Sequence, residues 1–187
     1  LFDANDATDE TIRWSMQRLG EVNRPVAMIP GNHDCVDGTG IYQRYDFNTI
    51  SNVAMFTEPE GAVRTYPDLH TTVWGKGMVD HSPEHRPLSG CPAPMDPGHW
   101  YIGLAHGIYV PRGASTGRSS QIAHEEIESS PCDYLALGHH HAALHIETEG
   151  AHAAFCGSPT DTIGGGATYA IVELEAERAP RVEIEVL

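Results

Sequence analysis

The chain has 187 residues, and because it carries 11 Lys or Arg against 26 Asp or Glu, its formal net charge is −15. At this length we expect one domain, residues 1–187, that buries roughly 70% of its unfolded surface without help from disulfides. The composition excludes a disordered tail, and no apolar run approaches the ~20 residues of a membrane-spanning helix. A single lysine, Lys76, leaves no basic stripe for a nucleic-acid backbone.

The first predicted elements alternate helix with strand. Residues 8–19 carry apolar side chains at helical spacing, and short apolar runs follow at residues 26–29, 101–105 and 134–137. Runs of this length are typical of strands that are buried on both faces. A helix is expected over residues 120–128, before the third run. This alternation predicts an α/β fold.

The C-terminal third has a different pattern. Residues 144–147 and 182–186 alternate apolar with polar side chains, as half-exposed antiparallel strands do, and residues 168–174 predict a further strand. Between residues 80 and 100, repeated prolines exclude a helix or a central strand. We therefore expect a long surface loop there.

The cysteines show no CxxC pair and no spacing typical of a disulfide framework; they are Cys35, Cys91, Cys132 and Cys156. This usage suits reduced thiols and a cytoplasmic location. We expect Cys35 to pack beneath the polar residues that precede it, with a metal-ligating thiol as the alternative.

Polar residues follow each of the three apolar runs. Asn32, His33 and Asp34 follow the first run, His106 follows the second, and three histidines, residues 139–141, follow the third. Ligand sites in open α/β sheets lie at this edge. We expect four candidate metal ligands to converge there: Asn32, His106, His139 and His141. Each histidine alone is more simply a hydrogen-bonded core or surface residue, but matching groups at three strand ends favour a site. An amide oxygen with imidazoles suits Mn²⁺, Fe or Zn²⁺ better than Mg²⁺.

These blocks, in this order, resemble those of the calcineurin-like metallophosphoesterases. The family pattern is DxH, GDxxD, GNHD, a lone His after a strand, and GHxH; here Gly31–Asp34, His106 and Gly138–His141 match the last three. The resemblance implies an α/β/β/α sandwich of two mixed sheets. Cys156–Pro159 also resembles the turn that follows the last block in DNA repair exonuclease subunits of the SbcCD type.

Residues 1–3, Leu-Phe-Asp, resemble the end of the second family block, which would make Asp3 its last aspartate. The resemblance therefore implies that a strand, a helix and a second strand belong before Leu1, together with the first ligand blocks. We expect the chain as given to be a poor catalyst and to associate through the sheet edge that this leaves. Asn32, His106 and His139 would serve one metal, and His141 the other.

The resemblance also implies a reaction. Two divalent ions, with Mn²⁺ expected first and Fe or Zn²⁺ as alternatives, would activate water for attack on phosphorus. His33 would protonate or stabilise the leaving oxygen, and Asp34 would orient its ring. On physical grounds an imidazole held by a carboxylate is a plausible general acid. Without the resemblance, His33 fits a turn or a helix cap.

Other histidines have simpler interpretations. We expect His140 to face away from the metals and to shape the pocket wall, and His145 and His152 to face solvent. Three histidines lie in the proline-rich loop, where a solvated position is expected and the border of a substrate cleft is the alternative: His81, His85 and His99.

We therefore predict a metal-dependent phosphoesterase that hydrolyses a phosphodiester or a phosphomonoester, with a DNA exonuclease as one form. The charge of −15 argues against nucleic acid, because its binding depends on Lys and Arg. A small phosphodiester or nucleotide is the nearest alternative substrate. The alternative class of function is a non-catalytic scaffold that keeps this fold to bind partners.

Overall fold

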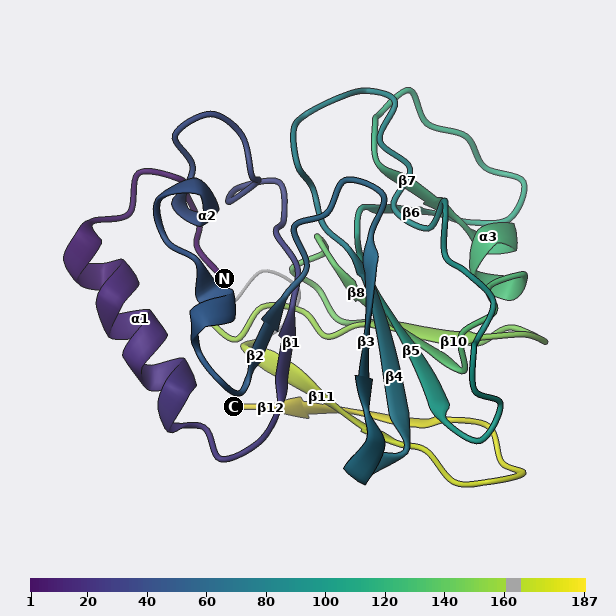
Figure 1. The fold of residues 1–187 in the computed structure, drawn as a ribbon. Helices are drawn as coiled ribbons and strands as arrows, with labels where there is room; N and C mark the ends of the chain where they lie inside the picture. Colours follow the sequence, from purple (N-terminus) through teal and green to yellow (C-terminus); the bar gives the residue numbers. More distant parts are fainter. Residues whose placement is uncertain (161–165) are drawn as a thin grey trace.

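The computed structural model describes residues 1–160 and 166–187, and its centre is a six-stranded mixed sheet (Figure 1). The strand order is β3 (Ala62–Tyr66), β4 (Thr71–Lys76), β5 (Trp100–His106), β8 (Tyr134–Gly138), β10 (His152–Phe155) and β9 (Leu144–Ile146). The four inner strands are parallel, and the edge strands β3 and β9 are antiparallel to their neighbours. The predicted α/β class is confirmed.

One face of the central sheet carries the larger hydrophobic core. Trp74, Leu135 and Phe155 come from three of its strands, and they are all at least 99% buried. Along β5 the burial alternates from residue to residue. The expectation that this strand is buried on both faces is therefore wrong, because only every second side chain enters the core.

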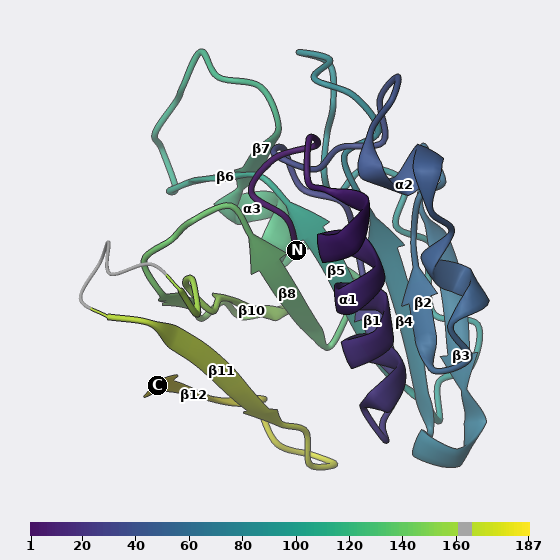
Figure 2. The same cartoon turned by 90° about the vertical axis from the view of Figure 1, so that its left-hand side faces the viewer.

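A second layer contains the N-terminal part of the chain. Its elements are α1 (Asp9–Glu21), β1 (Val26–Met28), α2 (Ile41–Arg44), the 3-10 turn η1 (Phe47–Thr49) and β2 (Val53–Met55). A second 3-10 turn, η2 (Pro67–Leu69), joins β3 to β4 in the central sheet. The Thr8 side chain accepts the Thr11 N–H and so caps α1. Figure 2 shows α1 in front of the parallel pair β1 and β2, where Ile12 is completely buried.

Two glycines of the β4 strand and its extension let the layers approach closely. A Cβ on Gly75 would lie 2.7 Å from the Phe56 ring, and a Cβ on Gly77 would lie 2.2 Å from Pro30. The Met78 N–H donates to the Pro30 carbonyl at 3.0 Å. The segment that follows β1 is thereby held beside the C-terminal end of β4, at the edge where β5 and β8 also end.

The helix expected over residues 120–128 is shorter than predicted. Residues Gln121–Ala123 form β7, which pairs with β6 (Ile108–Val110), and α3 spans only His124–Glu128. The reason is tertiary: Ile122 is completely buried, and the Ala123 N–H donates to the Glu126 carboxylate at 2.8 Å, which starts the helix there.

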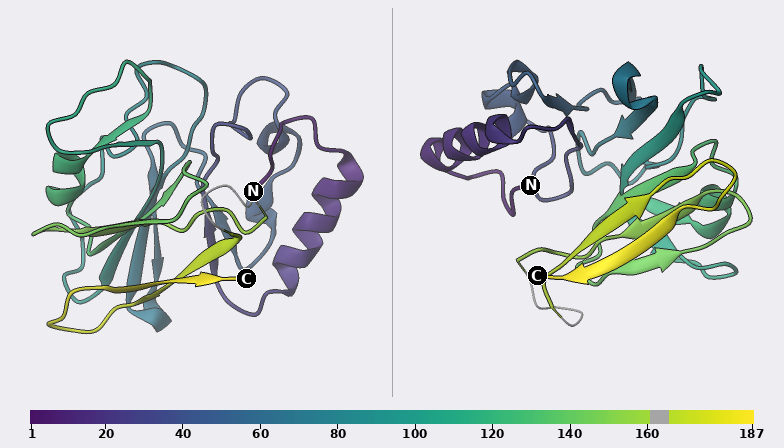
Figure 3. Two further views of the ribbon diagram at one scale, coloured as in Figure 1. Left: turned by 180° about the vertical axis from the view of Figure 1, so that it is seen from behind. Right: turned by 90° about the horizontal axis from the view of Figure 1, so that it is seen from below.

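The C-terminal hairpin pairs β11 (Thr168–Glu173) with β12 (Arg181–Val186) in the antiparallel sense. It lies at the bottom of Figure 1 and in the foreground of the right-hand view of Figure 3. The strands predicted in this third of the chain are confirmed, and so is the irregular course of residues 80–99. No helix in the described part of the chain is long and apolar enough to cross a membrane.

Candidate metal centre

Three of the four candidate ligands meet at the ends of their strands. The Asn32 side-chain oxygen lies 2.7 Å from His106 Nε2 and 3.4 Å from His139 Nδ1. The two imidazole rings are 5.4 Å apart, centre to centre. Ligand bonds to such metals are ~2.0–2.2 Å long, so neighbouring donors around one ion lie about 3 Å apart. The three donors therefore fit the coordination sphere of a single ion.

The strand register explains this convergence. β5 and β8 pair so that His106 lies opposite Gly138, which places His139 beside the His106 ring. A Cβ on Gly138 would lie 2.9 Å from His106 Nδ1, and a Cβ on Gly31 would lie 2.7 Å from His106 Cε1. The imidazole thus occupies the space that side chains at both glycines would fill.

His139 has a strained backbone, with φ at 117°. A residue with a side chain rarely adopts this conformation, which costs on the order of 1–3 kcal/mol and persists only where the surroundings hold it. Such residues concentrate at functional sites. Here the conformation accompanies a ring nitrogen placed toward Asn32.

Burial keeps both imidazoles neutral. Desolvation, helped by the positive charge of a protonated His139, lowers the pKa of His106 to about 4. Desolvation and then the nearby His140 lower the pKa of His139. A neutral imidazole has a free lone pair, so the environment that disfavours a proton suits a metal ion.

His141 lies two residues further along the chain. Its carbonyl accepts the Ser158 N–H at 3.1 Å, which ties the histidine stretch to the turn at residues 156–159. The charged form of His141 also contributes to the lowered pKa of His139, so the two side chains are within electrostatic reach. Its service to a second metal stays a prediction.

The side chain that holds His33 is Asp3. His33 Nδ1 lies 2.8 Å from Asp3 Oδ1 and 3.0 Å from the Asp3 carbonyl. We expected Asp34 in this position, and that expectation is wrong. The two neighbouring side chains diverge, so that His33 is exposed whereas Asp34 is buried.

Asp34 instead organises the loop around it. Its carboxylate accepts hydrogen bonds from the Gly31 N–H at 2.7 Å, the Phe2 N–H at 3.1 Å and the Tyr42 hydroxyl at 2.7 Å. Burial raises the pKa of Asp34, whereas the hydrogen bonds from Tyr42 and Gly31 lower it. Its role in the described structure is to fix the backbone that carries Asn32.

The remaining histidines of the C-terminal half pack against neighbouring side chains. The His140 ring packs on Phe155 at 4.5 Å and accepts the Tyr109 N–H, so it is held between β10 and β6. His145 and His152 do not face solvent as expected. They are half-buried with their rings 5.7 Å apart, because β9 and β10 pair and bring them together.

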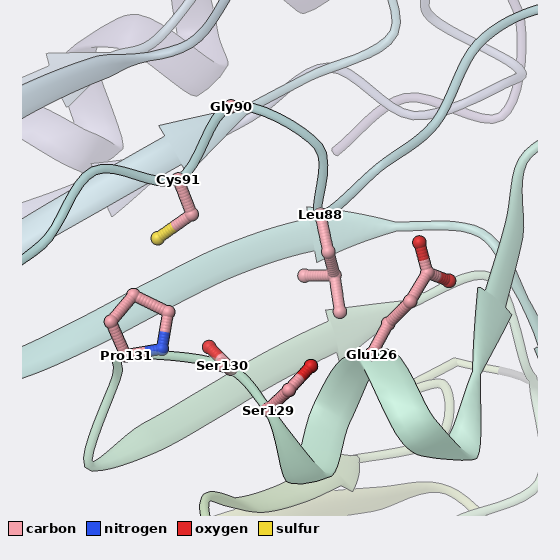
Figure 4. A pocket seen from close by; sticks show the side chains of 7 residues that line it. All are labelled: Leu88, Gly90, Cys91, Glu126, Ser129, Ser130 and Pro131. Carbon is pink, nitrogen blue, oxygen red and sulfur yellow. The ribbon is translucent and has the colours of Figure 1, made fainter.

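A shallow pocket of about 210 Å³ lies away from this centre, between α3 and the proline-rich loop (Figure 4). Its lining includes Cys91, Glu126 and Ser130, and none of the candidate metal ligands. The strand-end cluster is therefore the better candidate for chemistry.

Sequence reasoning missed two residues near the centre. One is Asp3 as the partner of His33, and the other is Arg118, whose positive charge contributes to the lowered pKa of His139. Arg118 lies in the loop between β6 and β7. A lone arginine in a loop carries no local signal that would link it to a distant histidine.

The comparison with protein families agrees with this geometry. Residues 5–177 match the calcineurin-like phosphoesterase superfamily domain, and the chain belongs to this family. Its members bind divalent metal ions and hydrolyse phosphoester bonds. A search of curated protein sequences gave no significant match.

Proposed function

We propose that the chain is a metal-dependent hydrolase of a phosphodiester or phosphomonoester. The observation that carries the proposal is the meeting of one amide oxygen and two neutral imidazoles, from Asn32, His106 and His139, at three strand ends. These residues would hold one divalent ion, and His141 would contribute to a second. Mn²⁺ suits this mixed donor set, with Fe or Zn²⁺ as alternatives.

Bound divalent ions would supply an acidic water and polarise a phosphoryl oxygen. The chain itself would supply a proton donor. In the imidazolium form of His33, Asp3 accepts the hydrogen bond from Nδ1–H, and the Nε2–H is left to give its proton to the leaving oxygen. Asn32 and His33 are adjacent, so the loop fixed by Asp34 positions ligand and proton donor together.

The substrate we favour is a small phosphodiester or nucleotide. Arg118 is an exposed cation within electrostatic reach of His139, and one such cation suits a single phosphate. A DNA exonuclease is the second candidate, favoured by the resemblance of residues 156–159. The net charge of −15 opposes it, because affinity for nucleic acid depends on many phosphate contacts. Four free cysteines support a reducing, cytoplasmic setting.

The test is a pair of histidine variants. We expect His139→Ala to lose bound Mn²⁺, measured by elemental analysis after dialysis, and to lose turnover of an aryl phosphodiester. The control is His70→Asn, an exposed histidine whose left-handed backbone asparagine tolerates. Loss of neither metal nor turnover in His139→Ala would contradict the proposal and favour the non-catalytic scaffold.

A further inference from the structure

A second cluster of metal-binding side chains lies outside the strand-end centre. Ligand atoms of Cys35, Asp37 and His81 are all within 4.8 Å of one another. Cys35 Sγ and His81 Nε2 are 3.4 Å apart. We propose that these three side chains bind a zinc ion, and that this site is separate from the phosphoesterase centre.

The donor set has the chemistry of a zinc site. Thiolate sulfur, imidazole nitrogen and carboxylate oxygen are the three donor types that zinc takes from proteins, with bonds of ~2.0–2.3 Å. In a tetrahedral site these bonds place neighbouring donors about 3.3–3.7 Å apart. The Cys35–His81 distance already fits, and Asp37 is exposed, so its side chain can rotate to complete the set.

The backbone around the cluster is already held in place. The Val36 N–H donates to the Met78 carbonyl at 3.2 Å, which joins the segment that carries Cys35 to the segment that leads to His81. The Asn5 amide donates to the Cys35 carbonyl at 3.0 Å and lies 3.5 Å from Asp37 Oδ1. The ligands are therefore presented by fixed main chain, which lowers the conformational entropy lost on binding.

The burial of the thiol and the solvent access of the other two side chains also suit a bound metal ion. Cys35 is 99% buried, whereas Asp37 and His81 are exposed, so an ion could enter from solvent and seat against the thiol. Three protein ligands leave a fourth position for water. The ion would cross-link the loop after β1 to the loop after β4, two segments that are 46 positions apart at Cys35 and His81.

The site shares no donor with Asn32, His106 or His139, so it does not depend on the proposed function. Cobalt(II) can distinguish the two sites, because only a thiolate ligand gives an intense sulfur-to-metal charge-transfer absorption in the near ultraviolet. We expect the whole chain, reduced and titrated with Co²⁺, to show this band, and Zn²⁺ to abolish it by displacement. Zn²⁺ should also raise the melting temperature.

Single-residue variants show which side chains produce the Co²⁺ absorption band. Cys35→Ser should remove it. Loss of an outer-shell partner alone commonly costs about 10–100-fold in metal affinity, so His81→Asn and Asp37→Asn should each weaken Co²⁺ binding at least that much. Both replace exposed side chains, so they keep the test valid if Cys35→Ser fails to fold. Cys91→Ser is the matched control, because Cys91 is a half-buried thiol that also has a close partner, Cys132 Sγ at 3.7 Å.

The result that overturns the site is no band in the parent chain, or a full band in Cys35→Ser. Unchanged Co²⁺ affinity in both His81→Asn and Asp37→Asn would equally overturn it, since the pair of Cys35 and His81 would then be only a hydrogen bond. His139→Ala should retain the band. Loss of Mn²⁺ with the band retained, or loss of the band with Mn²⁺ retained, would show which of the two proposed sites is affected. Each proposal could then be accepted or rejected on its own.

Discussion

Two glycines fix the position of His106. Gly31 and Gly138 both lie against its ring, and a methyl group on either would lie 2.9 Å or less from a ring atom. These glycines begin the blocks that carry Asn32 and His139. The glycines are therefore as necessary for the centre as the ligands, because they make room for the ligand.

We expect Gly138→Ala to weaken Mn²⁺ binding and to lower the free energy of unfolding by about 1–3 kcal/mol, since the added methyl forces the His106 ring to move. Equilibrium dialysis and urea unfolding measure the two effects. Gly117→Ala is the matched control, because no atom lies within 4 Å of the Cβ it would add. Equal behaviour of the two variants would show that the ring is not confined by Gly138.

Variants of Asp3 and Asp34 should have different effects, the first on turnover and the second on stability. Asp3→Asn leaves the fold intact but weakens the hold on His33, so turnover should fall while metal content stays constant. His33→Ala should lower turnover by about 10²–10⁴ with the same metal content. Asp34→Asn should instead lower stability, because the carboxylate is buried and accepts several hydrogen bonds. A stable Asp34→Asn with a turnover defect like that of His33→Ala would reverse these assignments.

Stability of the metal-free protein should depend on pH through His106. Its pKa is lowered from 6.5 to about 4, so below pH 6.5 the unfolded chain binds a proton that the folded chain does not. The free energy of unfolding should fall as the pH drops from about 6.5 to about 4, by up to about 3 kcal/mol from this group. Urea unfolding in EDTA across this range measures it. His106→Gln should flatten the dependence, and parallel curves for parent and variant would contradict the assignment.

At the scale of elements, apolar runs predicted the strands that carry the ligands and missed β4 and β10, which lie beside them in the sheet. β1, β5 and β8 lie in continuous apolar runs, whereas β4 and β10 include polar residues. The short strands β6 and β7, which pair with one another, were also missed. The ligand geometry was predictable because parallel strands end at a common edge. The Asp3–His33 contact was not, because Asp3 lies before α1 in a segment without regular structure, so no strand register fixes its position.

The reassignment of residues 121–123 from helix to strand makes Ile122 a test of the β6–β7 pair. It is completely buried, so Ile122→Ala should cost about 2–5 kcal/mol in the free energy of unfolding. Ile171, which is 44% exposed on β11, provides the control, and Ile171→Ala should change stability by no more than about 0.5 kcal/mol. A small effect at Ile122 would mean that this pair does not pack on the core.

At the scale of the whole molecule, the charge of the protein opposes its proposed substrates. A chain with net charge −15 repels a phosphoester at long range, and the attraction at the centre acts only within a few ångströms. Metal ions bound at the centre would reverse the field locally. The proposed function would therefore combine general repulsion of polyanions with local attraction of one phosphate at the metal centre.

This combination predicts the sign of the salt dependence. For a small anionic phosphodiester, kcat/KM should rise as the ionic strength increases from about 10 to 150 mM, because salt screens the repulsion between enzyme and substrate. A protein that binds nucleic acid through several phosphate contacts would show the opposite, a loss of about 10³–10⁵ in affinity between about 50 and 200 mM salt. Arg118→Gln should raise KM and steepen the rise, since it removes a cation within electrostatic reach of His139. Measuring kcat/KM for an aryl phosphodiester and for single-stranded DNA over this range separates the two substrates. A steep fall with salt on DNA would overturn the preference for a small phosphodiester and favour the exonuclease.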